Sequence, residues 1–320
     1  MVTVTPTADA PTAAPPHARR RTGGRSVLRL LILVVIVAVV LYPLIWMVGT
    51  SVKSQEEIVN NIGLLPERFT PGNYTAGWSN FDVGFGRFFL NSAMVSLLTV
   101  VGNGLSCLLA AYAFARLRFR LRGMWFAVMI GTLLLPSHVL IVPQYILFRT
   151  LGLVGGEWPY LPLLIPQFLA TEAFFVFLMV QFMRGVPREL DEAARIDGAG
   201  PYGIFRHIIL PLSRPALVTT AIFSFIWTWN DFFRQLVFLS QLEDYTVPVA
   251  LTLFIDSTSQ SAVGPMFAMS VLSLLPVFLF FVAFQRMLID STSQSAVGPM
   301  FAMSVLSLLP VFLFFVAFQR

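Results

Sequence analysis

Three ionisable residues lie in apolar runs of the sequence, where they could bind a polar solute. Glu172 lies in one run, and Asp231 and Arg234 lie three residues apart in another. Burying an unpaired charge is costly, so these residues are candidates for function. Residues three apart share a helix face, so Asp231 and Arg234 can pair. Trp229 and Asn230 add a ring face and an amide that suit hydroxylated rings. Polar contact between helices is the alternative role for all five.

The segment Glu189–Pro215 is polar and helix-forming, and it could bind a soluble partner. It reads ELDEAARIDGAGPYGIFRHIILPLSRP. Acidic residues in its first turn favour a helix at its start. Gly198, Gly200 and Pro201 then predict a sharp turn. A second short helix is expected at Tyr202–Ile209. We expect a rigid helix–turn–helix that can transmit a push; a connector that only links its neighbours is the alternative.

The sequence carries no motif for ATP hydrolysis and no cluster of metal ligands. Its one lysine, Lys53, follows Val52, so it cannot complete the phosphate-binding pattern G-x-x-x-x-G-K-[ST]. Its one cysteine, Cys107, lies in an apolar run, where we expect a packed thiol. We therefore expect no catalytic residue, metal or cofactor in this chain. Any ATP hydrolysis would come from a partner subunit.

The composition predicts an all-α, polytopic membrane protein. Hydrophobic residues make up 57% of the chain and charged residues 12%, and the mean hydropathy is +0.78. Soluble domains have about 25% charged residues. The apolar runs are continuous rather than alternating, which favours helices over a barrel. With about 20 residues to a span, six are expected: Val27–Gly49, Phe88–Ala115, Met124–Phe148, Tyr160–Met183, Pro215–Leu239 and Met266–Phe284.

Two features inside these spans predict local structure. Pro136 and Pro143 predict a kink or break in the outer half of the third span. Asn91 and Asn103 in the second span are expected to make hydrogen bonds between helices.

The distribution of arginine orients the spans. Arginines cluster before the first span, after the second and after the fourth, whereas Ser51–Arg87 and Gln241–Pro265 carry no such excess. The positive-inside rule then places the N-terminus and the Glu189–Pro215 segment in the cytoplasm. The basic stretches lack interleaved aromatic residues, so we expect the lipid bilayer, and no nucleic acid, as their partner.

Both ends of the chain differ from the middle. Residues 1–26 are rich in Ala, Pro, Thr and Arg and predict a disordered cytosolic tail. A cleaved signal peptide is the alternative, but no clear small-x-small site follows. Residues 27–286 form the expected transmembrane domain. Residues 289–320 repeat 255–286 without a change. We interpret 287–320 as an artefactual or non-functional duplicate, with a seventh span as the alternative.

The spacing within Glu189–Pro215 resembles that of the EAA loop of ABC importer permeases. Glu192-Ala193-Ala194 is followed after three residues by Gly198, and after nine more by Ile208-x-Leu210-Pro211. The resemblance implies a type I importer permease fold with six transmembrane helices. It also implies that this loop docks on a separate ATPase. The coupling residues would be Glu192, Ala193, Ala194, Asp197, Gly198, Phe205, Ile208, Leu210 and Pro211.

Further motifs resemble the MalG-like carbohydrate branch of that family. They are Ser51-Val52-Lys53, Asn73-Tyr74, Phe89-Leu90-Asn91-Ser92, Trp229-Asn230-Asp231-Phe232 and Tyr245-Thr246-Val247-Pro248-Val249. The resemblance implies a multi-pass protein of the bacterial inner or plasma membrane that forms half of a sugar or oligosaccharide path. Its implied partners are a second permease in a heterodimer, two ATP-binding subunits and an extracytoplasmic solute-binding protein.

In such a protein, Trp229, Asn230, Asp231, Arg234 and Glu172 are candidates for the translocation path. The alternatives are an importer permease for a non-sugar solute, such as a polyamine, a peptide or an anion, or an ion-gradient-driven secondary transporter.

Overall fold

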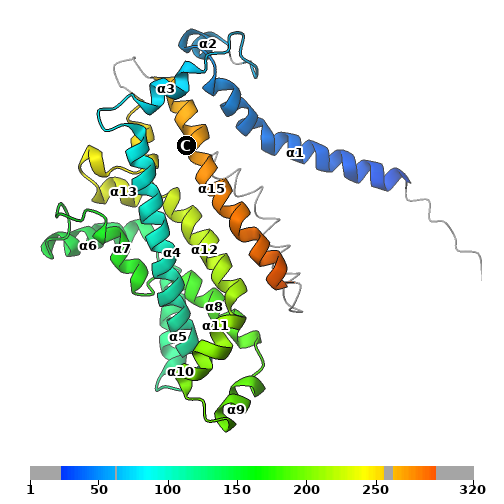
Figure 1. The fold of residues 1–320 in the computed structure, drawn as a ribbon, viewed down its shortest axis with the longest axis vertical. Coiled ribbons are helices and arrows are strands. Elements are labelled where there is room, and N and C mark those ends of the chain that lie inside the picture. The colour runs from blue at the N-terminus through cyan, green and yellow to red at the C-terminus, as the bar shows by residue number, and fades with distance from the viewer. Residues whose placement is uncertain (1–22, 62, 256–261, 293–320) are drawn as a thin grey trace, which may run out of the picture. The chain divides into compact units, whose positions relative to one another are not determined.

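The computed structural model describes residues 23–61, 63–255 and 262–292, and every regular element within them is a helix. The all-α class is therefore confirmed (Figure 1). The chain divides into two compact units, Met1–Tyr42 and Pro43–Arg320. Most of the expected tail, and the repeated segment from residue 293 onward, lie outside the described residues.

Four stretches of the described residues are long and apolar enough to cross a membrane, and a bent pair of helices raises the number to five. The four match the first, second, fourth and sixth predicted spans: Leu30–Ser51, Phe85–Arg116, Leu161–Gly185 and Val263–Gln285. The bent pair joins Pro201–Leu212 to Arg214–Trp229 at 69° and contains the start of the fifth. The first stretch belongs to α1 (Gly23–Ser51).

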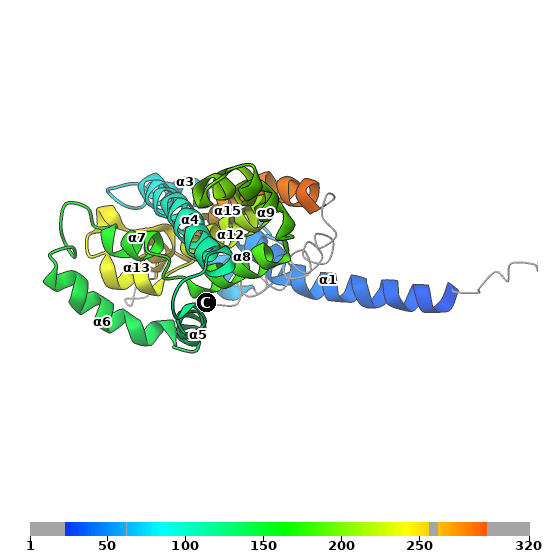
Figure 2. The same ribbon diagram turned by 90° about the horizontal axis from the view of Figure 1, so that it is seen from below.

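Helix α4 (Phe85–Arg116) is the central element of residues 43–320. It packs against α7 (Leu161–Phe168), α8 (Ala173–Gly185) and α12 (Arg214–Trp229). Helix α15 (Val263–Thr292) packs on the other side of α12. In the view from below, α4, α8, α12 and α15 lie next to one another (Figure 2). The long helix therefore contacts α12, which carries Trp229, and α8, which Glu172 precedes.

The third predicted span is divided into two shorter helices, α5 (Arg122–Thr132) and α6 (Ser137–Thr150). The break falls before Pro136, where the backbone is extended. A proline has no N–H and restricts the residue before it, so the helix ends there. The break predicted from the sequence is confirmed, although Pro143 lies inside α6.

The fourth predicted span is interrupted in its middle, so Glu172 lies at a helix break and not within a helix. Helix α7 ends at Phe168 and α8 begins at Ala173. Ala170 has a φ of 53°, in the left-handed region. The Thr171 hydroxyl donates to the Pro166 carbonyl at 2.8 Å, which gives that carbonyl a partner outside the regular helix.

The fifth predicted span is shorter than expected, because α12 ends at Trp229 and not near Leu239. The Asn230 side chain donates back to the Ile226 carbonyl at 2.8 Å and competes with the helical ladder. The chain continues as the separate helix α13 (Phe233–Phe238). Asp231 and Arg234, expected on one face of a continuous span, therefore lie at a second break.

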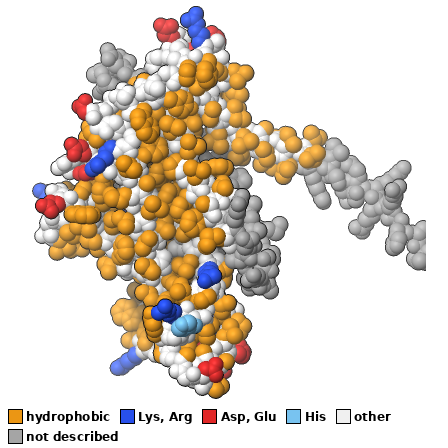
Figure 3. Space-filling model, in the orientation of Figure 1, with side chains coloured by type: hydrophobic (Ala, Val, Ile, Leu, Met, Phe, Trp, Pro, Cys, Tyr) orange, Lys and Arg blue, Asp and Glu red, His pale blue; other side chains and the backbone are white. Residues whose placement is uncertain are grey.

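Short helices lie at the end of residues 43–320 opposite Glu189–Pro215 (Figure 1). They are α2 (Gln55–Asn60), α3 (Gly72–Trp78), η2 (Leu242–Asp244) and α14 (Val247–Thr252). Between the two ends, hydrophobic side chains cover most of the face in Figure 3. Leu97, Leu105 and Leu109 of α4 are among the exposed ones. An apolar surface of this kind suits lipid or a second membrane subunit.

Candidate functional site

The polar loop (Glu189–Pro215) folds as a helix, a turn and a second helical segment, as the sequence predicts. Helix α9 (Glu189–Ile196) comes first. After the turn, α10 (Pro201–Ile204), a π-helical turn η1 (Phe205–Ile209) and α11 (Leu210–Leu212) follow without a gap. The π-helical turn is the feature that the sequence does not predict; such turns are frequent at functional sites.

Gly198 closes α9 with a Schellman motif. Its φ is 85°, in the left-handed region that glycine adopts without strain. Its N–H donates to the Arg195 carbonyl at 3.0 Å, and the Ala199 N–H donates to the Ala194 carbonyl at 2.9 Å. This pair of bonds defines the motif. No atom lies within 4 Å of the position that a Cβ would take, so the backbone angle, and not crowding, requires glycine.

The nine residues that the resemblance assigns to coupling lie on two different faces of the loop. Glu192, Ala193, Asp197 and Gly198 are exposed. The others are at least partly buried, and all but Pro211 pack against the core that α4 and α8 form: Ala194, Phe205, Ile208, Leu210 and Pro211. Phe205 in particular lies 5.1 Å from the ring of Tyr112, centroid to centroid. In this chain it anchors the loop from within.

Two exposed apolar side chains, which the sequence motifs do not mark, accompany the outward face. Ile196 is 86% exposed and Tyr202 is 71% exposed. They flank the Gly198 turn, one at the end of α9 and one in α10. Apolar side chains on a polar, water-exposed loop are typical of a protein contact. The sequence does contain a signal for Ile196. A helix that begins at Glu189 must end near Ile196, because Gly198 and Gly200 follow it.

Arg116 and Asp191 attach the loop to the rest of the fold. Arg116 Nη1 lies 3.1 Å from Asp191 Oδ2, and the two side chains are 4% and 9% exposed. Arg116 Nη2 also donates to the carbonyls of Met183 and Val186, each at 2.7 Å. In the sequence, Arg116 is only one of several arginines that follow the second span, and no motif singles out Asp191.

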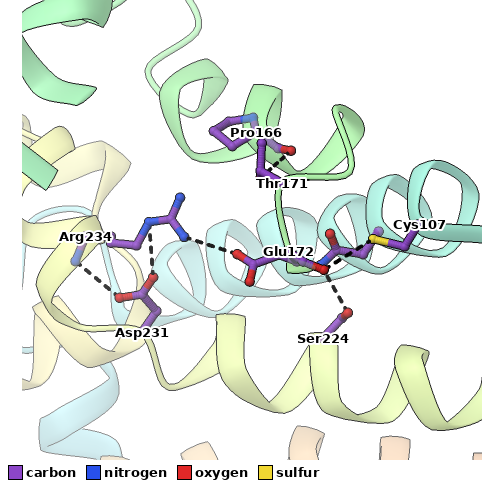
Figure 4. A network of polar contacts seen from close by, with 8 residues as sticks. Cys107, Pro166, Thr171, Glu172, Ser224, Asp231 and Arg234 are labelled. Atoms are coloured by element: carbon purple, nitrogen blue, oxygen red, sulfur yellow. Dashed lines mark hydrogen bonds and ion pairs between the residues drawn. The ribbon is translucent and has the colours of Figure 1, made fainter. Parts of the chain in front are cut away.

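Glu172, Asp231 and Arg234, the three ionisable candidates of the translocation path, meet at the two helix breaks (Figure 4). Arg234 Nη1 lies 3.8 Å from Glu172 Oε1, and Arg234 Nε lies 4.0 Å from Asp231 Oδ2. The Arg234 backbone N–H also donates to Asp231 Oδ1 at 3.2 Å. The predicted pairing of Asp231 with Arg234 is present, and Glu172 joins it from the break before α8.

This trio is partly accessible and not fully hydrogen-bonded. The three side chains are between 23% and 33% exposed. Arg234 Nε has no hydrogen-bond partner among the described residues. Two carboxylates and one guanidinium offer both acceptors and donors, the combination that hydroxyl groups need. No group of three or more possible metal ligands occurs in the described ranges.

Trp229 and Asn230, the other two candidates, bond within the chain. The Trp229 indole is 2% exposed, stacks on Phe225 and donates through Nε1 to the Ser273 carbonyl at 3.1 Å. Asn230 caps the end of α12. In this conformation the Trp229 ring packs between α12 and α15.

Second-span asparagines make the contacts between elements that were expected. Asn103 Nδ2 donates to the Ser224 hydroxyl of α12 at 3.2 Å. Asn91 Nδ2 donates to the carbonyls of Glu243 and Tyr245, at 2.8 and 2.9 Å. Ser92 beside it accepts the Val247 N–H at 2.8 Å. Two of the MalG-like motifs are thereby in direct contact.

Two further MalG-like motifs, Ser51-Val52-Lys53 and Asn73-Tyr74, also contact each other. Asn73 donates to the carbonyls of Ser51 and Lys53, at 2.9 and 2.8 Å, and Ser51 Oγ lies 2.9 Å from Tyr74 Oη. Lys53 is 1% exposed and donates to the Gly63 carbonyl. These residues support the loop before α3, which explains their spacing in the sequence.

Comparison with known proteins identifies relatives that match most of the chain. A family model described as "Binding-protein-dependent transport system inner membrane component" matches residues 102–294. A diacetylchitobiose uptake system permease protein of Streptomyces coelicolor is 31% identical, over 78% of this chain and 81% of that protein. A trehalose transport system permease protein of Mycobacterium tuberculosis is 31% identical, over 78% and 90%.

Two further matches extend the comparison. An alpha-glucoside transport system permease protein of Rhizobium meliloti is 39% identical, over 57% of this chain and 48% of that protein. Among solved structures, a chain of a bacterial ABC transporter involved in the import of the acidic polysaccharide alginate matches with a TM-score of 0.71. It is 23% identical and covers 87% of this chain and 99% of that chain, so it supports the fold.

Proposed function

Since the chain belongs to the family of binding-protein-dependent transport system inner membrane components, we propose that it forms half of the translocation path for a sugar or oligosaccharide. It is a multi-pass membrane permease subunit of an ABC importer and not itself an enzyme. It works with other subunits of such a transporter.

The observation that carries this proposal is the polar loop. A Schellman turn at Gly198 presents exposed Glu192 and Asp197 together with exposed Ile196 and Tyr202. An apolar centre with charged neighbours suits a protein partner. We assign this face to a separate ATPase, which would hydrolyse ATP and move the loop. The inward residues, such as Phe205, would hold the loop in place.

Sugar as the cargo is supported by two observations. The printed names of three relatives refer to diacetylchitobiose, alpha-glucosides and trehalose. The trio of Glu172, Asp231 and Arg234 supplies acceptors and donors that are partly exposed within a largely apolar fold. Hydroxyl groups can use both. We propose that these three residues contact the solute, while Trp229 supports them from within the core.

The proposed assembly contains a second permease, two ATP-binding subunits and an extracytoplasmic solute-binding protein. The N-terminus and the polar loop would lie in the cytoplasm of a bacterial cell, and α2, α3 and η2 on the outer side. Residues 27–286 would suffice for transport. A chain truncated after Arg286 should then support uptake as the full chain does, and loss of uptake with normal membrane insertion would contradict this domain assignment.

Uptake measurements test the proposal. Cells that express the complete transporter are given radiolabelled diacetylchitobiose, trehalose or maltose, with and without the gene for this chain. We expect uptake of at least one saccharide that depends on this chain and stops when ATP is depleted. Uptake that survives ATP depletion but collapses with the ion gradient would support a secondary transporter instead. Uptake of spermidine, a tripeptide or sulfate alone would move the assignment to a non-sugar importer.

A further inference from the structure

Two adjacent acidic residues of α9 have opposite surroundings. Asp191 is buried, with 6% of the residue exposed, whereas Glu192 is exposed. Asp191 Oδ2 pairs with Arg116, and its Oδ1 has no hydrogen-bond partner among the described residues. Arg116 is therefore the cation that compensates the Asp191 charge. Glu192 points to the outside, where the proposed ATPase would bind.

Arg116 joins α4 to two other helices, α8 and α9. It is the last residue of α4, and its side chain is held by Asp191 of α9 and by the carbonyls of Met183 and Val186. Met183 lies in the last turn of α8, and Val186 follows that helix. A guanidinium carries five donors in a rigid fork, so it can bind three acceptors that a lysine ammonium could not hold in the same geometry.

A second contact joins α4 to the far side of the Gly198 turn. The Tyr112 hydroxyl donates to the Pro201 carbonyl at 2.8 Å, and its ring packs on Phe205. Tyr112 lies one helical turn before Arg116 in α4. The two residues therefore hold the segments on either side of the turn, Arg116 through α9 and Tyr112 through α10.

We propose that Arg116 is the positioning residue of the polar loop: its buried ion pair with Asp191 presets the orientation of α9, so that Glu192 and the Gly198 turn face the ATPase. This inference rests on the proposed coupling function of the loop. Moving α9 away from α4 would separate a buried charge pair and leave Arg116 without its carboxylate. Breaking such a pair by removing one partner is strongly destabilising. The loop is therefore held in its docking orientation before the ATPase binds, which lowers the ordering cost of that contact.

The two neighbouring acids provide a matched test. Asp191→Asn removes the inward charge and Glu192→Gln removes the outward one, each with little change in shape. Amide hydrogen exchange of peptides covering residues 186–200 is measured on the purified membrane-embedded chain without the ATPase, and again in the complete transporter. Asp191→Asn should speed exchange in the free chain about tenfold or more, and Glu192→Gln should leave it unchanged.

ATP-driven uptake per ATP hydrolysed supplies the functional readout. The complete transporter is reconstituted in proteoliposomes and given whichever of labelled diacetylchitobiose, trehalose and maltose it imports. For Asp191→Asn, the amount of saccharide taken up per ATP hydrolysed should be about tenfold lower than for the wild type. This loss lies in the upper part of the range for substitutions that alter coupling. Arg116→Ala should act like Asp191→Asn, and Arg118→Ala, an exposed neighbour, like the wild type. If the Arg116→Ala protein does not accumulate, the test uses Asp191→Asn and Tyr112→Phe instead. Tyr112→Phe removes only the hydrogen bond to the Pro201 carbonyl.

The outcomes separate this inference from the proposed function. Wild-type exchange and coupling in Asp191→Asn would overturn the positioning role. An equal rise in the exchange rate of the free chain for Glu192→Gln and for Asp191→Asn would also overturn the positioning role. A chain that binds no ATPase would instead refute the proposed function, and the exchange of the free chain would still report whether Arg116 holds the loop.

Discussion

Arg234 and Glu172 face each other across two interruptions of the helical bundle, with Arg234 Nη1 3.8 Å from Glu172 Oε1. One residue follows the end of α12 and the other precedes α8. Both helices pack on α4, so the two breaks are held in contact by a shared neighbour. The interruption of two spans at one place brings the ionisable side chains of both breaks into contact.

Arg234→Ala should lower uptake about tenfold or more. Without the guanidinium, the Glu172 and Asp231 carboxylates lose the cation between them, and an unpaired charge at membrane depth is costly. Initial uptake rates of the labelled saccharide measure the effect. Arg149→Ala, which removes an exposed arginine at the end of α6, serves as the control and should transport normally. Equal uptake in the two variants would contradict a role for Arg234.

Substitutions at Gly198 should rank by their tolerance of a positive φ. Asn tolerates the left-handed region better than Ala, whose penalty is about 1–2 kcal/mol. Uptake should therefore fall in the order Gly, Asn, Ala. Asp should abolish uptake although the complex still assembles, because a carboxylate beside Asp197 opposes the negative end of the α9 dipole and alters the docking face. Uptake and co-purification of the ATPase are measured together. Wild-type uptake by Gly198→Asp would contradict the coupling role.

Two glycines of α4 should respond oppositely to alanine. A Cβ at Gly102 would lie 2.9 Å from the Phe168 ring and 3.2 Å from the Gln167 backbone, whereas one at Gly104 would meet nothing within 4 Å. Gly102→Ala should destabilise the chain by about 1–3 kcal/mol through overpacking of α4 on α7. Gly104→Ala should be neutral or stabilise by up to about 1 kcal/mol. Thermal unfolding in detergent compares them, and equal melting temperatures would contradict this packing.

The stability of the η2 region should depend on pH through Asp244. Burial, and next the neighbouring Glu243, raise the pKa of Asp244 above its ordinary value, and Arg87 opposes the shift. The folded state then binds the proton more tightly than the unfolded state. Stability should rise as the pH falls through the folded pKa and level off below the unfolded value. Asp244→Asn should remove this dependence. Melting temperatures of the wild type and of Asp244→Asn, measured between pH 7 and pH 4, should therefore converge at the acidic end. Parallel curves for the two proteins would refute the assignment to Asp244.

The membrane-spanning segments could be predicted from the sequence because hydropathy determines which segments are buried in the bilayer. The breaks at residues 169–172 and 230–232 could not, since apolar residues continue on both sides of them. There, Thr171 and Asn230 satisfy backbone carbonyls locally, and the competition with the helical ladder depends on rotamers that composition does not reveal. The Pro136 break was predictable because proline acts through its covalent structure.

The polar loop was located by its spacing, but its division into two faces was not. Asp191 and Glu192 are chemically alike and adjacent, and only the rotation of α9 against α4 separates them. Likewise Arg116, Arg118, Arg120 and Arg122 contribute equally to the charge bias that orients the spans. Arg116 alone of the first three is buried, because α4 ends with it. Such distinctions depend on tertiary contacts.

Helix α4 attaches several of its neighbouring segments through their main-chain groups. Asn91 binds the carbonyls of residues 243 and 245, Ser92 an N–H of residue 247, and Tyr112 the carbonyl of residue 201. Main-chain groups are the same for almost every amino acid. At positions other than side-chain anchors such as Asp191 and Phe205, the loops at both ends of α4 can therefore change their side chains and keep these bonds, so exposed residues can be exchanged to fit a different partner without rebuilding the scaffold.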